Sequence, residues 1–334
     1  METKKVLLTG GLGYIGSHIV VSLSDPSSAI IADDCSNCDL KQIDRLKQVI
    51  PFEKNQVIVC DVADLEAFEE IFKKHKIETI IHLAGYKAVG ESVKQPLAYY
   101  TNNLNATLNV LKMCNKYDVK HLIFSSSATV YGPQSSPMDE SMTLLKTTNP
   151  YAETKAISER MIEDYCLVHP EFSATSLRYF NPVGAHPSGF IGEIPSGIPN
   201  NLLPYVQQVA SGKRPYLNVF GKDYETKDGT AIRDYIHVMD LADAHVCILN
   251  NPKQGYRVYN VGTGVGTSVL DLVKAFEKAT GVKIPTEVTH RRAGDLQESV
   301  ANASKINKEL GWKSRYSIED ICKDAWNFEK HQSN

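Results

Sequence analysis

A tyrosine and a lysine stand four residues apart in the sequence NPYAETK, residues 149–155. The segment is typical of a helix start, so Tyr151 and Lys155 are expected to share one face of that helix. A free phenol titrates near about 10, so tyrosine acts as a base at neutral pH only if its pKa is lowered, which a nearby ammonium favours. The pair could therefore move a proton. Taken alone, it is equally typical of a solvated helix edge.

A glycine-rich turn close to the N-terminus could hold a dinucleotide. Gly10, Gly13 and Gly16 follow the apolar run VLLT and precede a segment of helical character. Glycines at this spacing permit a tight turn, close approach of a pyrophosphate to backbone N–H groups, and close packing of a helix on a strand. Asp33 ends the next apolar run, which completes the context that such a turn requires.

The acidic residues after the predicted strands indicate which dinucleotide is bound. Asp33 would accept hydrogen bonds from the hydroxyls of the adenosine ribose, whereas a 2′-phosphate would meet the charges of Asp33 and Asp34. NAD is therefore expected rather than NADP. Asp61, with Val62 beside it, is placed to meet the adenine. The alternative, in which Asp33 and Asp61 only form turns at strand ends, is less consistent with the glycine turn.

Six apolar segments must position these residues. They are short, rich in β-branched residues and separated by segments of helix length, as expected for buried parallel strands. We predict an α/β fold with a Rossmann-like, doubly wound parallel sheet, whose strands meet at one edge with their carboxyl ends, where ligands bind. The segments are KKVLLTG, AIIADD, QVIVCD, ETIIHLAG, HLIFSSS and SATSLRYF.

The character of the chain changes at residue 181. Residues 181–205 are rich in proline and glycine, a composition that we expect to sustain neither a helix nor a central strand. A long irregular loop in a compact domain is usually a lid or a binding loop. Two domains are predicted: an NAD-binding, Rossmann-like domain at residues 1–180 and a smaller mixed α/β substrate-binding domain at residues 181–334.

Composition excludes several classes of partner. The 334 residues include 36 basic and 39 acidic side chains, so neither a nucleic acid nor a membrane surface is expected as a partner. No segment approaches the roughly 20 apolar residues of a membrane span. The apolar run VLL near the start is too short for the core of a signal peptide. We therefore expect a cytoplasmic protein.

The seven cysteines, an odd number scattered along the chain, do not indicate a disulfide framework. Cys35 and Cys38 form a C-x-x-C pair, which could be a redox pair or half of a zinc site. The sequence contains no second pair at metal-ligand spacing, so we interpret this pair as a coincidence and expect no metal.

The glycine turn, HLAG, SSSATVYG and PYAETK together resemble the extended short-chain dehydrogenase/reductase family. The resemblance implies that Tyr151 is the acid/base, that Lys155 holds the nicotinamide ribose and that Ser127 bridges to the substrate. Of the three consecutive serines, Ser127 matches by family position. Ser125 and Ser126 would be structural or lie near the nicotinamide.

Longer motifs are similar to the UDP-galactose 4-epimerase (UDP-glucose 4-epimerase) branch of that family. They are TGGLGYIGSH, AGYKAVGESV, FSSSATVYG, LRYFNPVGAHPSG, GIPNNLLPY and RDYIHVMDLADAH. The resemblance implies an isomerase with tightly bound NAD that oxidises a UDP-hexose at C4, lets the 4-keto sugar rotate and returns the hydride from transient NADH to the opposite face. It also implies a homodimer joined by helices, for which residues 102–114 and 153–168 are candidates, although their apolar faces would equally suit internal packing.

The resemblance further assigns residues of the predicted first domain to the cofactor. They comprise the glycine turn, the acidic positions after the strands, a lysine at the pyrophosphate and a tyrosine beside the nicotinamide. The set is Gly10, Gly13, Tyr14, Ile15, Gly16, Asp33, Asp34, Asn37, Asp61, Val62, Leu83, Ala84, Gly85, Lys87, Asn102, Ser125, Tyr151, Lys155 and Tyr179.

A second set matches the family's contacts to the UDP-sugar. Arg233 and Arg292 would face the diphosphate, where planar guanidinium groups make paired hydrogen bonds, and Asp295 would bind the ribose. Each could separately be an ordinary surface residue, but a nearly neutral protein must gather cations locally to hold a diphosphate. With Ser127 and Tyr151, the set is Asn181, Asn201, Leu202, Asn218, Phe220, Arg233, Tyr235, Arg292, Asp295 and Ser299.

Ser299 departs from the family form in which a tyrosine stands seven residues after the second arginine. A bulky aromatic side chain there crowds the substituent at C2 of the sugar, whereas a small one leaves room for an N-acetyl group. We therefore predict activity on UDP-GalNAc and UDP-GlcNAc as well as on UDP-galactose and UDP-glucose. The alternative is that neighbouring side chains refill the space.

Related functions are less consistent with the sequence. A 4,6-dehydratase would need an Asp-Glu pair just before VYG, where this chain has Ala128 and Thr129. A UDP-glucuronate 4-epimerase, or another NAD-dependent nucleotide-sugar enzyme such as a decarboxylase, would need a partner for the substrate carboxylate, which we do not identify. A non-catalytic NAD-binding sensor would have no need of Ser127, Tyr151 and Lys155 together.

Overall fold

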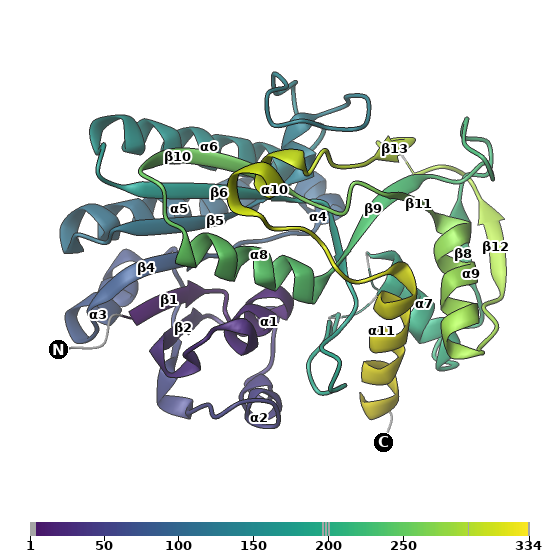
Figure 1. Ribbon diagram of the computed structural model, residues 1–334, viewed down its shortest axis with the longest axis horizontal. Coiled ribbons are helices and arrows are strands. Elements are labelled where there is room, and N and C mark those ends of the chain that lie inside the picture. Colours follow the sequence, from purple (N-terminus) through teal and green to yellow (C-terminus); the bar gives the residue numbers. More distant parts are fainter. Residues whose placement is uncertain (1–4, 196, 198, 200, 293, 333–334) are drawn as a thin grey trace. The chain divides into compact units, whose positions relative to one another are not determined.

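The computed structural model describes residues 5–195, 197, 199, 201–292 and 294–332 (Figure 1). The chain forms two compact units, and both are assembled from separate segments. The first unit comprises Met1–Gly132, Thr143–Arg178 and Ala242–Tyr259, and the second comprises Pro133–Met142, Tyr179–Leu241 and Asn260–Asn334.

Helices and strands alternate through the first half of the chain, as the sequence predicts. The α-helices are α1 (Tyr14–Ser22), α2 (Gln42–Lys47), α3 (Leu65–Lys74), α4 (Val89–Lys94), α5 (Pro96–Tyr117), α6 (Pro150–Val168), α7 (Leu202–Ala210), α8 (Val238–Asn250), α9 (Val269–Thr280), α10 (Ser304–Leu310) and α11 (Ile318–Gln332). The strands are β1 (Lys5–Thr9), β2 (Ala29–Asp33), β3 (Val57–Val59), β4 (Ile77–His82), β5 (His121–Ser127), β6 (Ser173–Tyr179), β7 (Asn181–Val183), β8 (Leu217–Phe220), β9 (Ile232–His237), β10 (Gly255–Val261), β11 (Gly266–Ser268), β12 (Thr286–Thr289) and β13 (Glu298–Ser299). Short 3-10 helices are η1 (Pro26–Ser28), η2 (Lys54–Gln56) and η3 (Ala128–Tyr131).

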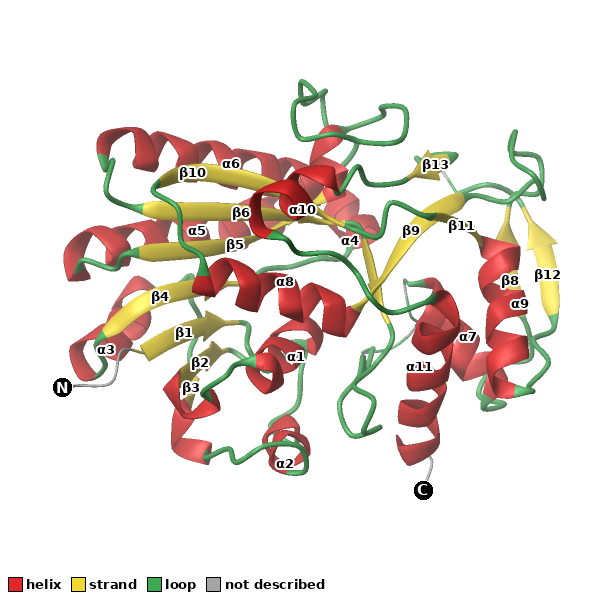
Figure 2. Ribbon diagram, viewed as in Figure 1, coloured by secondary structure: helices red, strands yellow, loops and turns green. Residues whose placement is uncertain are grey.

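The first unit is built on a seven-stranded sheet of order β10-β6-β5-β4-β1-β2-β3 (Figure 2). Strand β1 pairs in parallel with β2 on one side and β4 on the other, so Thr9 lies between Ala32 and His82. The pairs β2 with β3 and β4 with β5 are also parallel. Strand order reverses at β1, and ligands of such sheets bind beyond the carboxyl ends of the strands at this reversal. The predicted Rossmann-like fold is confirmed.

Both faces of this sheet are buried. Leu7 and Leu8 are neighbours in β1, and both are fully buried although their side chains point to opposite faces. Helices α3, α5 and α6 cover one face and contribute Phe68, Val110 and Ile162 to a shared apolar core. Burial on both faces explains why these strands consist of continuous apolar runs.

Strand β10 was not among the six predicted strands. Its sequence, GYRVYNV, mixes polar and apolar residues, and the chain passes through the second unit before it returns as the edge strand beside β6. Because residues 242–259 belong to the first unit, the division of the chain differs from a single boundary at residue 180.

The second unit is a mixed α/β assembly around β9. Strand β9 pairs in parallel with β7 and with β13, and antiparallel with β11. Strands β8 and β12 form a separate parallel pair. Helices α7, α9 and α11 supply Leu203, Phe276 and Ile321 to the apolar core of this unit. Several polar residues assigned to the substrate therefore lie on or beside β9.

The proline- and glycine-rich segment after residue 180 is regular at both ends. Asn181–Val183 forms β7, in which Pro182 lies opposite Ile236 of β9. Helix α7 tolerates Pro204 in its first turn because the N–H groups there have no partner within the helix. The prediction that this composition excludes helix and strand was therefore wrong at these ends. Between them, described residues 184–195 are irregular apart from a bridge between Ala185 and Gly192.

Within the part of the chain that the structure describes, no helix has both the length and the apolar character needed to cross a membrane. All seven cysteines are free thiols, and Cys114 and Cys322 are buried among apolar side chains. These two cysteines therefore act as small apolar side chains within the cores.

Candidate active site

The turn between β1 and α1 has space only for glycine at two positions. Gly10 has a left-handed backbone, φ +70°, and a Cβ there would lie 2.8 Å from the backbone nitrogen of Ala84. A Cβ at Gly16 would lie 2.6 Å from the Cα of Gly11, which is rigid backbone. The turn is therefore held close to the end of β4, and the first turn of α1 packs directly on it.

The N-terminus of α1 is suited to an anion. Gly13 is the N-cap residue of α1 and has no side chain that could bond the first N–H groups of the helix, those of Tyr14 and Ile15. Such N–H groups lack partners within the helix and carry the positive end of the helix dipole. A pyrophosphate at this position would be held by backbone donors.

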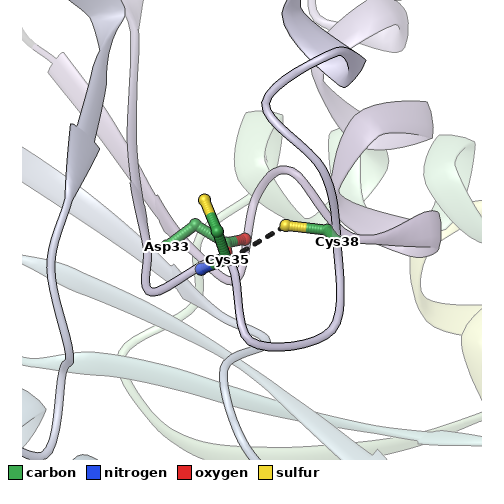
Figure 3. A group of neighbouring side chains, drawn as sticks. All are labelled: Asp33, Cys35 and Cys38. Carbon is green, nitrogen blue, oxygen red and sulfur yellow. Dashed lines mark hydrogen bonds between the residues drawn. The ribbon is translucent and has the colours of Figure 1, made fainter. Parts of the chain in front are cut away.

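Asp33 ends β2 and is buried against the glycine turn. Its Oδ2 accepts a hydrogen bond from the backbone N–H of Leu12 at 3.0 Å, and its Oδ1 accepts from the N–H of Cys35 at 3.0 Å and from the thiol of Cys38 at 3.3 Å (Figure 3). A carboxylate offers about four acceptor positions, so capacity remains for a ribose hydroxyl. Burial and the charge of Asp33 raise the pKa of both thiols, so neither adds negative charge at neutral pH.

Other predicted cofactor residues follow the strand ends of the first unit. Asp34 and Asp61 are exposed, and each accepts a hydrogen bond from the backbone N–H two residues later, that of Ser36 and that of Ala63. Both carboxylates therefore take part in turns, and their contacts with the cofactor stay predictions. Asp61 follows β3 at a distance of two residues rather than ending it. Of the rest, Val62 and Tyr179 are buried, Leu83 and Ala84 are half-buried, and Asn37, Gly85 and Lys87 are exposed.

The chain after β4 is fixed by Asn103, which the sequence did not single out. Its Oδ1 accepts a hydrogen bond from the N–H of Tyr86 at 2.8 Å, and its Nδ2 donates to the Tyr86 carbonyl at 3.1 Å and to Thr154 Oγ1 at 3.0 Å. The predicted Asn102 donates to the same Oδ1 at 3.1 Å. Buried Asn103 thus ties this loop to α5 and α6.

The predicted catalytic residues come together in the first unit. Helix α6 begins where the sequence indicates, because the side chain of Asn149 accepts a hydrogen bond from the N–H of Ala152 at 2.9 Å and Pro150 occupies the first helical position. Tyr151 lies in this first turn and shares a hydrogen bond with the side chain of Ser127, at the end of β5.

Thr129 orients the hydroxyl of Ser127. Ser127 Oγ accepts hydrogen bonds from the backbone N–H and from Oγ1 of Thr129, at 3.2 and 2.9 Å. A hydroxyl carries one proton, so a serine that accepts from two donors directs its own proton elsewhere. That proton is available to the oxygen of Tyr151. This role of Thr129 was not predicted, because its hydroxyl acts through a local contact that the sequence does not reveal.

Lys155 is buried one helical turn after Tyr151. Its Nζ donates a hydrogen bond to the backbone carbonyl of Ser125 at 2.6 Å and lies 4.8 Å from the centre of the Phe124 ring. Burial lowers the pKa of Lys155 to about 8, and the charge of Glu159 opposes this shift. The side chain therefore remains mostly protonated at neutral pH.

In the protein without a cofactor, burial and the hydrogen bond with Ser127 govern the ionisation of Tyr151, and the combined effect of Lys155 and the nicotinamide stays a prediction. Burial raises the pKa of Tyr151, and the hydrogen bond with Ser127 opposes that shift only in part. The ammonium of Lys155 is bound to the carbonyl of Ser125 instead of the phenol. A lower phenol pKa would require a further positive charge, such as the nicotinamide ring of oxidised NAD.

A buried ion pair joins α6 to β6. Arg178 donates from Nε and Nη2 to the two carboxylate oxygens of Glu159, at 3.0 and 2.7 Å, and Ser126 Oγ donates to Glu159 Oε1 at 2.5 Å. The guanidinium also lies 4.7 Å from the centre of the Tyr131 ring. These contacts tie α6, β5 and β6 together, and none was predicted.

In the second unit, two arginines converge on one carboxylate. Arg292 Nε lies 3.0 Å from Asp295 Oδ2, and Arg233 Nη2 lies 3.8 Å from Asp295 Oδ1. The guanidinium of Arg292 also stacks 4.8 Å from the centre of the Phe220 ring. With two positive charges and one negative, the cluster of Phe220, Arg233, Arg292 and Asp295 has a net positive charge. Such a cluster can hold a diphosphate beside an aromatic wall.

The register of β9 places further predicted residues beside this cluster. Tyr235 lies opposite Asn181 of β7, and Ser299 of β13 lies opposite Arg233. Burial raises the pKa of Tyr235 to about 12, with the nearby arginines opposing the shift, so its hydroxyl remains protonated. Asn201 and Leu202 begin α7, and Asn218 lies in β8.

Asp234, which the sequence did not single out, fixes the strands around the arginine cluster. Its fully buried carboxylate accepts hydrogen bonds from the backbone N–H groups of Thr263, Gly264 and Ala301, at 2.8, 2.9 and 3.2 Å. The last of these residues follows β13, so Asp234 holds Arg233 and Ser299 in register. An aspartate within a strand of apolar character is the signal that could have indicated it.

Comparisons with known proteins identify the family of the chain. Residues 6–262 match the NAD dependent epimerase/dehydratase family. The chain belongs to this family. It is 50% identical over 332 residues to UDP-glucose 4-epimerase 2 of Arabidopsis thaliana, which covers 97% of this chain and 95% of that protein.

Solved structures of other members of the epimerase/dehydratase family have the same fold. The UDP-glucose 4-epimerase of Bifidobacterium longum in complex with NAD+ and UDP is 44% identical, with a TM-score of 0.94 and 99% of each chain covered. The enzyme of Stenotrophomonas maltophila with bound NAD and formylated UDP-arabinopyranose is 41% identical, with the same score and coverage. NAD is the cofactor of this family. It fits the first unit, where the N-terminus of α1 and the glycine turn suit its pyrophosphate and Asp33 can still accept a hydrogen bond from its ribose.

Proposed function

We propose that the protein is an NAD-dependent isomerase, a UDP-glucose 4-epimerase that interconverts UDP-galactose and UDP-glucose through a 4-keto sugar. The observation that carries the proposal is the hydrogen-bonded pair Ser127 and Tyr151, with buried Lys155 beside it in the unit that contains the glycine turn. The proposal is supported by relatives of that name that align with nearly the whole chain.

The chain's own residues would move the proton. Tyr151 Oη would take the proton of the C4 hydroxyl and later return it, while Ser127 donates its hydrogen bond to whichever oxygen carries the charge. Bound NAD supplies the acceptor and donor of the hydride at C4. Lys155 would hold the nicotinamide ribose and keep a positive charge nearby.

The remaining predicted residues are proposed to bind the two ligands. The cofactor set named above belongs to the glycine turn, to the ends of the strands of the first sheet, and to α5 and α6. The cluster of Phe220, Arg233, Arg292 and Asp295 would hold uridine diphosphate, together with Asn181, Asn201, Leu202, Asn218 and Tyr235. Ser299 would lie at the sugar.

A conversion assay without a second substrate tests the activity. Purified protein incubated with UDP-galactose is expected to form UDP-glucose until both sugars are present at equilibrium, as measured by chromatography. UDP-glucuronate, UDP-GalNAc and UDP-GlcNAc are run in parallel. Conversion of UDP-glucuronate alone, or of no sugar, would contradict the proposal.

Replacing Arg292 should weaken substrate binding. For Arg292→Gln we expect the KM for UDP-galactose to rise about 10- to 100-fold with little change in kcat, because hydrogen bonds to charged groups contribute about 1.5–3 kcal/mol and this one acts away from the reacting carbon. The matched control is Arg291→Gln, since Arg291 pairs with Asp223 at 2.8 Å and stacks on Tyr224 at 3.9 Å. Equal changes in both variants would exclude a specific role for Arg292.

The size of Ser299 should decide which sugars are accepted. We propose that the protein also converts UDP-GalNAc and UDP-GlcNAc, because a half-buried serine opposite Arg233 leaves space that a tyrosine would fill. Ser299→Tyr should lower kcat/KM for the acetylated pair by 10-fold or more, as an order of magnitude for a steric clash, and leave UDP-galactose within about 3-fold. Equal rejection of acetylated sugars by both proteins would show that neighbouring side chains refill the space.

We also propose a cytoplasmic homodimer. Free thiols at all seven cysteines are consistent with a reducing compartment. Exposed apolar side chains on α5 and α6, namely Leu97, Leu108, Leu167 and Val168, could be covered by the same helices of a second copy. Sedimentation analysis of the purified protein would reveal a monomer if this proposal is wrong.

A further inference from the structure

Two thiols and a carboxylate meet at the end of β2 (Figure 3). One ligand atom of each of Asp33, Cys35 and Cys38 lies within 4.8 Å of the other two. Cys35 has a left-handed backbone, φ 59°, at the point where the chain turns back and brings Cys38 to Asp33. The sequence alone indicates only the C-x-x-C pair. Asp33 joins this pair because it is the last residue of β2 and directly precedes the turn.

The spacing between Cys38 and Asp33 is close to that of two ligands in a tetrahedral metal site. Zinc binds cysteine sulfur at about 2.3 Å and carboxylate oxygen at about 2.0–2.2 Å, so a sulfur and an oxygen on one zinc ion lie roughly 3.5 Å apart. Cys38 Sγ lies 3.3 Å from Asp33 Oδ1. The thiol proton now joins these two atoms, and a metal ion would take its position.

We propose that Asp33, Cys35 and Cys38 form a binding site for a divalent cation of the zinc class, which competes with the dinucleotide. Three protein ligands leave a fourth position for water. Binding forms two metal–sulfur bonds and one metal–oxygen bond, and it releases two thiol protons to the solvent. No electron transfer is needed.

Competition follows from the double role of Asp33. A carboxylate oxygen that binds the cation is no longer available to a ribose hydroxyl, and this part of the inference rests on the proposed function. Cys35 and Cys38 are half-buried, so the ion can approach from solvent. The cation would therefore act as an inhibitor and not as a resident cofactor.

Metal binding is tested on the full-length protein freed of bound NAD and without substrate, because the dinucleotide would compete for Asp33. In a reductant that is neither a thiol nor a chelator, Zn2+ is titrated by calorimetry, and Cd2+ is titrated with ultraviolet absorbance as a signal of thiolate ligands. We expect one ion per chain and a loss of affinity above about 10-fold in Cys35→Ser and in Cys38→Ser, since even outer-shell changes cost about 10- to 100-fold. Cys247→Ser, which replaces a half-buried cysteine outside the cluster, should bind as the wild type does.

Wild-type affinity in the double variant Cys35→Ser/Cys38→Ser, or no binding to the wild type, would overturn the site. A second measurement addresses competition: added NAD should weaken Zn2+ binding, and Zn2+ should inhibit turnover of the wild type but not of the double variant, with recovery on addition of EDTA. If Zn2+ binds through the cysteines and NAD does not weaken that binding, the proposed competition and the assignment of Asp33 to the ribose are overturned. The metal site itself would still be supported. Failure of epimerisation would not affect the calorimetric result, so the two proposals fail separately.

Discussion

Tyr151→Phe should reduce kcat for the interconversion of UDP-galactose and UDP-glucose by about 10³-fold, within the roughly 10²- to 10⁴-fold that general acid–base catalysis contributes. Phenylalanine keeps the ring in its half-buried position at the start of α6 and removes only the oxygen that exchanges the proton. Bound NAD and the KM should change little, because the glycine turn and the arginine cluster are untouched. Single-turnover and steady-state rates, with the NAD content measured for each sample, provide the test.

A matched control separates chemistry from folding. Tyr165→Phe makes the same change on the same helix. The ring of Tyr165 stacks on that of His169, with the ring centres 4.2 Å apart, and does not take part in the contact with Ser127. This variant should retain full turnover. Ser127→Ala should fall between the two, because it removes the hydrogen bond to the tyrosine but leaves the phenol in place. Undiminished activity of Tyr151→Phe would contradict the mechanism and favour a protein that binds NAD without turning over a sugar.

Features that depend on neighbours in sequence could be predicted. This is why the strands of the first unit and the start of α6 were predicted correctly. The strands β1, β2, β4, β5 and β6 are largely buried on both faces and so consist of apolar runs that differ clearly from the helices between them. The N-cap role of Asn149, with Pro150 after it, fixes the start of α6 within a few residues. The positions of Tyr151 and Lys155 on one helical face follow from their spacing alone.

Features that depend on distant partners, or on the exact backbone conformation of a turn, could not be predicted. Strand β10 pairs with β6 after the chain has passed through the second unit, and its mixed sequence gives no sign of a sheet. Asp33 was expected to meet a ribose, but its contact with Cys38 needs a local turn with a left-handed residue that the letters do not reveal. Glu159 looks like one more surface acid of α6, because its partner Arg178 lies 19 residues away on β6.

Glu159→Gln should lower the free energy of unfolding by about 3–5 kcal/mol, the usual effect of removing one partner from a buried ion pair. The side chains of Glu159 and Arg178 are only 4% and 5% exposed, so the guanidinium would be left charged in an environment that water does not reach. Chemical denaturation at neutral pH measures the change. Glu70→Gln is the matched control, since Glu70 pairs with Lys73 on the exposed face of α3 and both side chains are 52% exposed. Its denaturation midpoint should not move.

The same substitution should alter the pH dependence of turnover. The charge of Glu159 opposes the effect of burial on Lys155, whose pKa is about 8, so its loss should lower that pKa further. Lys155 is protonated below its pKa, and a lower pKa means that the ammonium is lost at a lower pH. The alkaline limit of activity should therefore shift to lower pH in Glu159→Gln, under conditions in which the protein remains folded. The double variant Glu159→Met/Arg178→Met should regain stability, because two apolar side chains pack together without a buried charge. Its alkaline limit should remain shifted, because the carboxylate that favours the charged form of Lys155 is still missing. The two results together would show that the ion pair affects stability and the pKa of Lys155 separately.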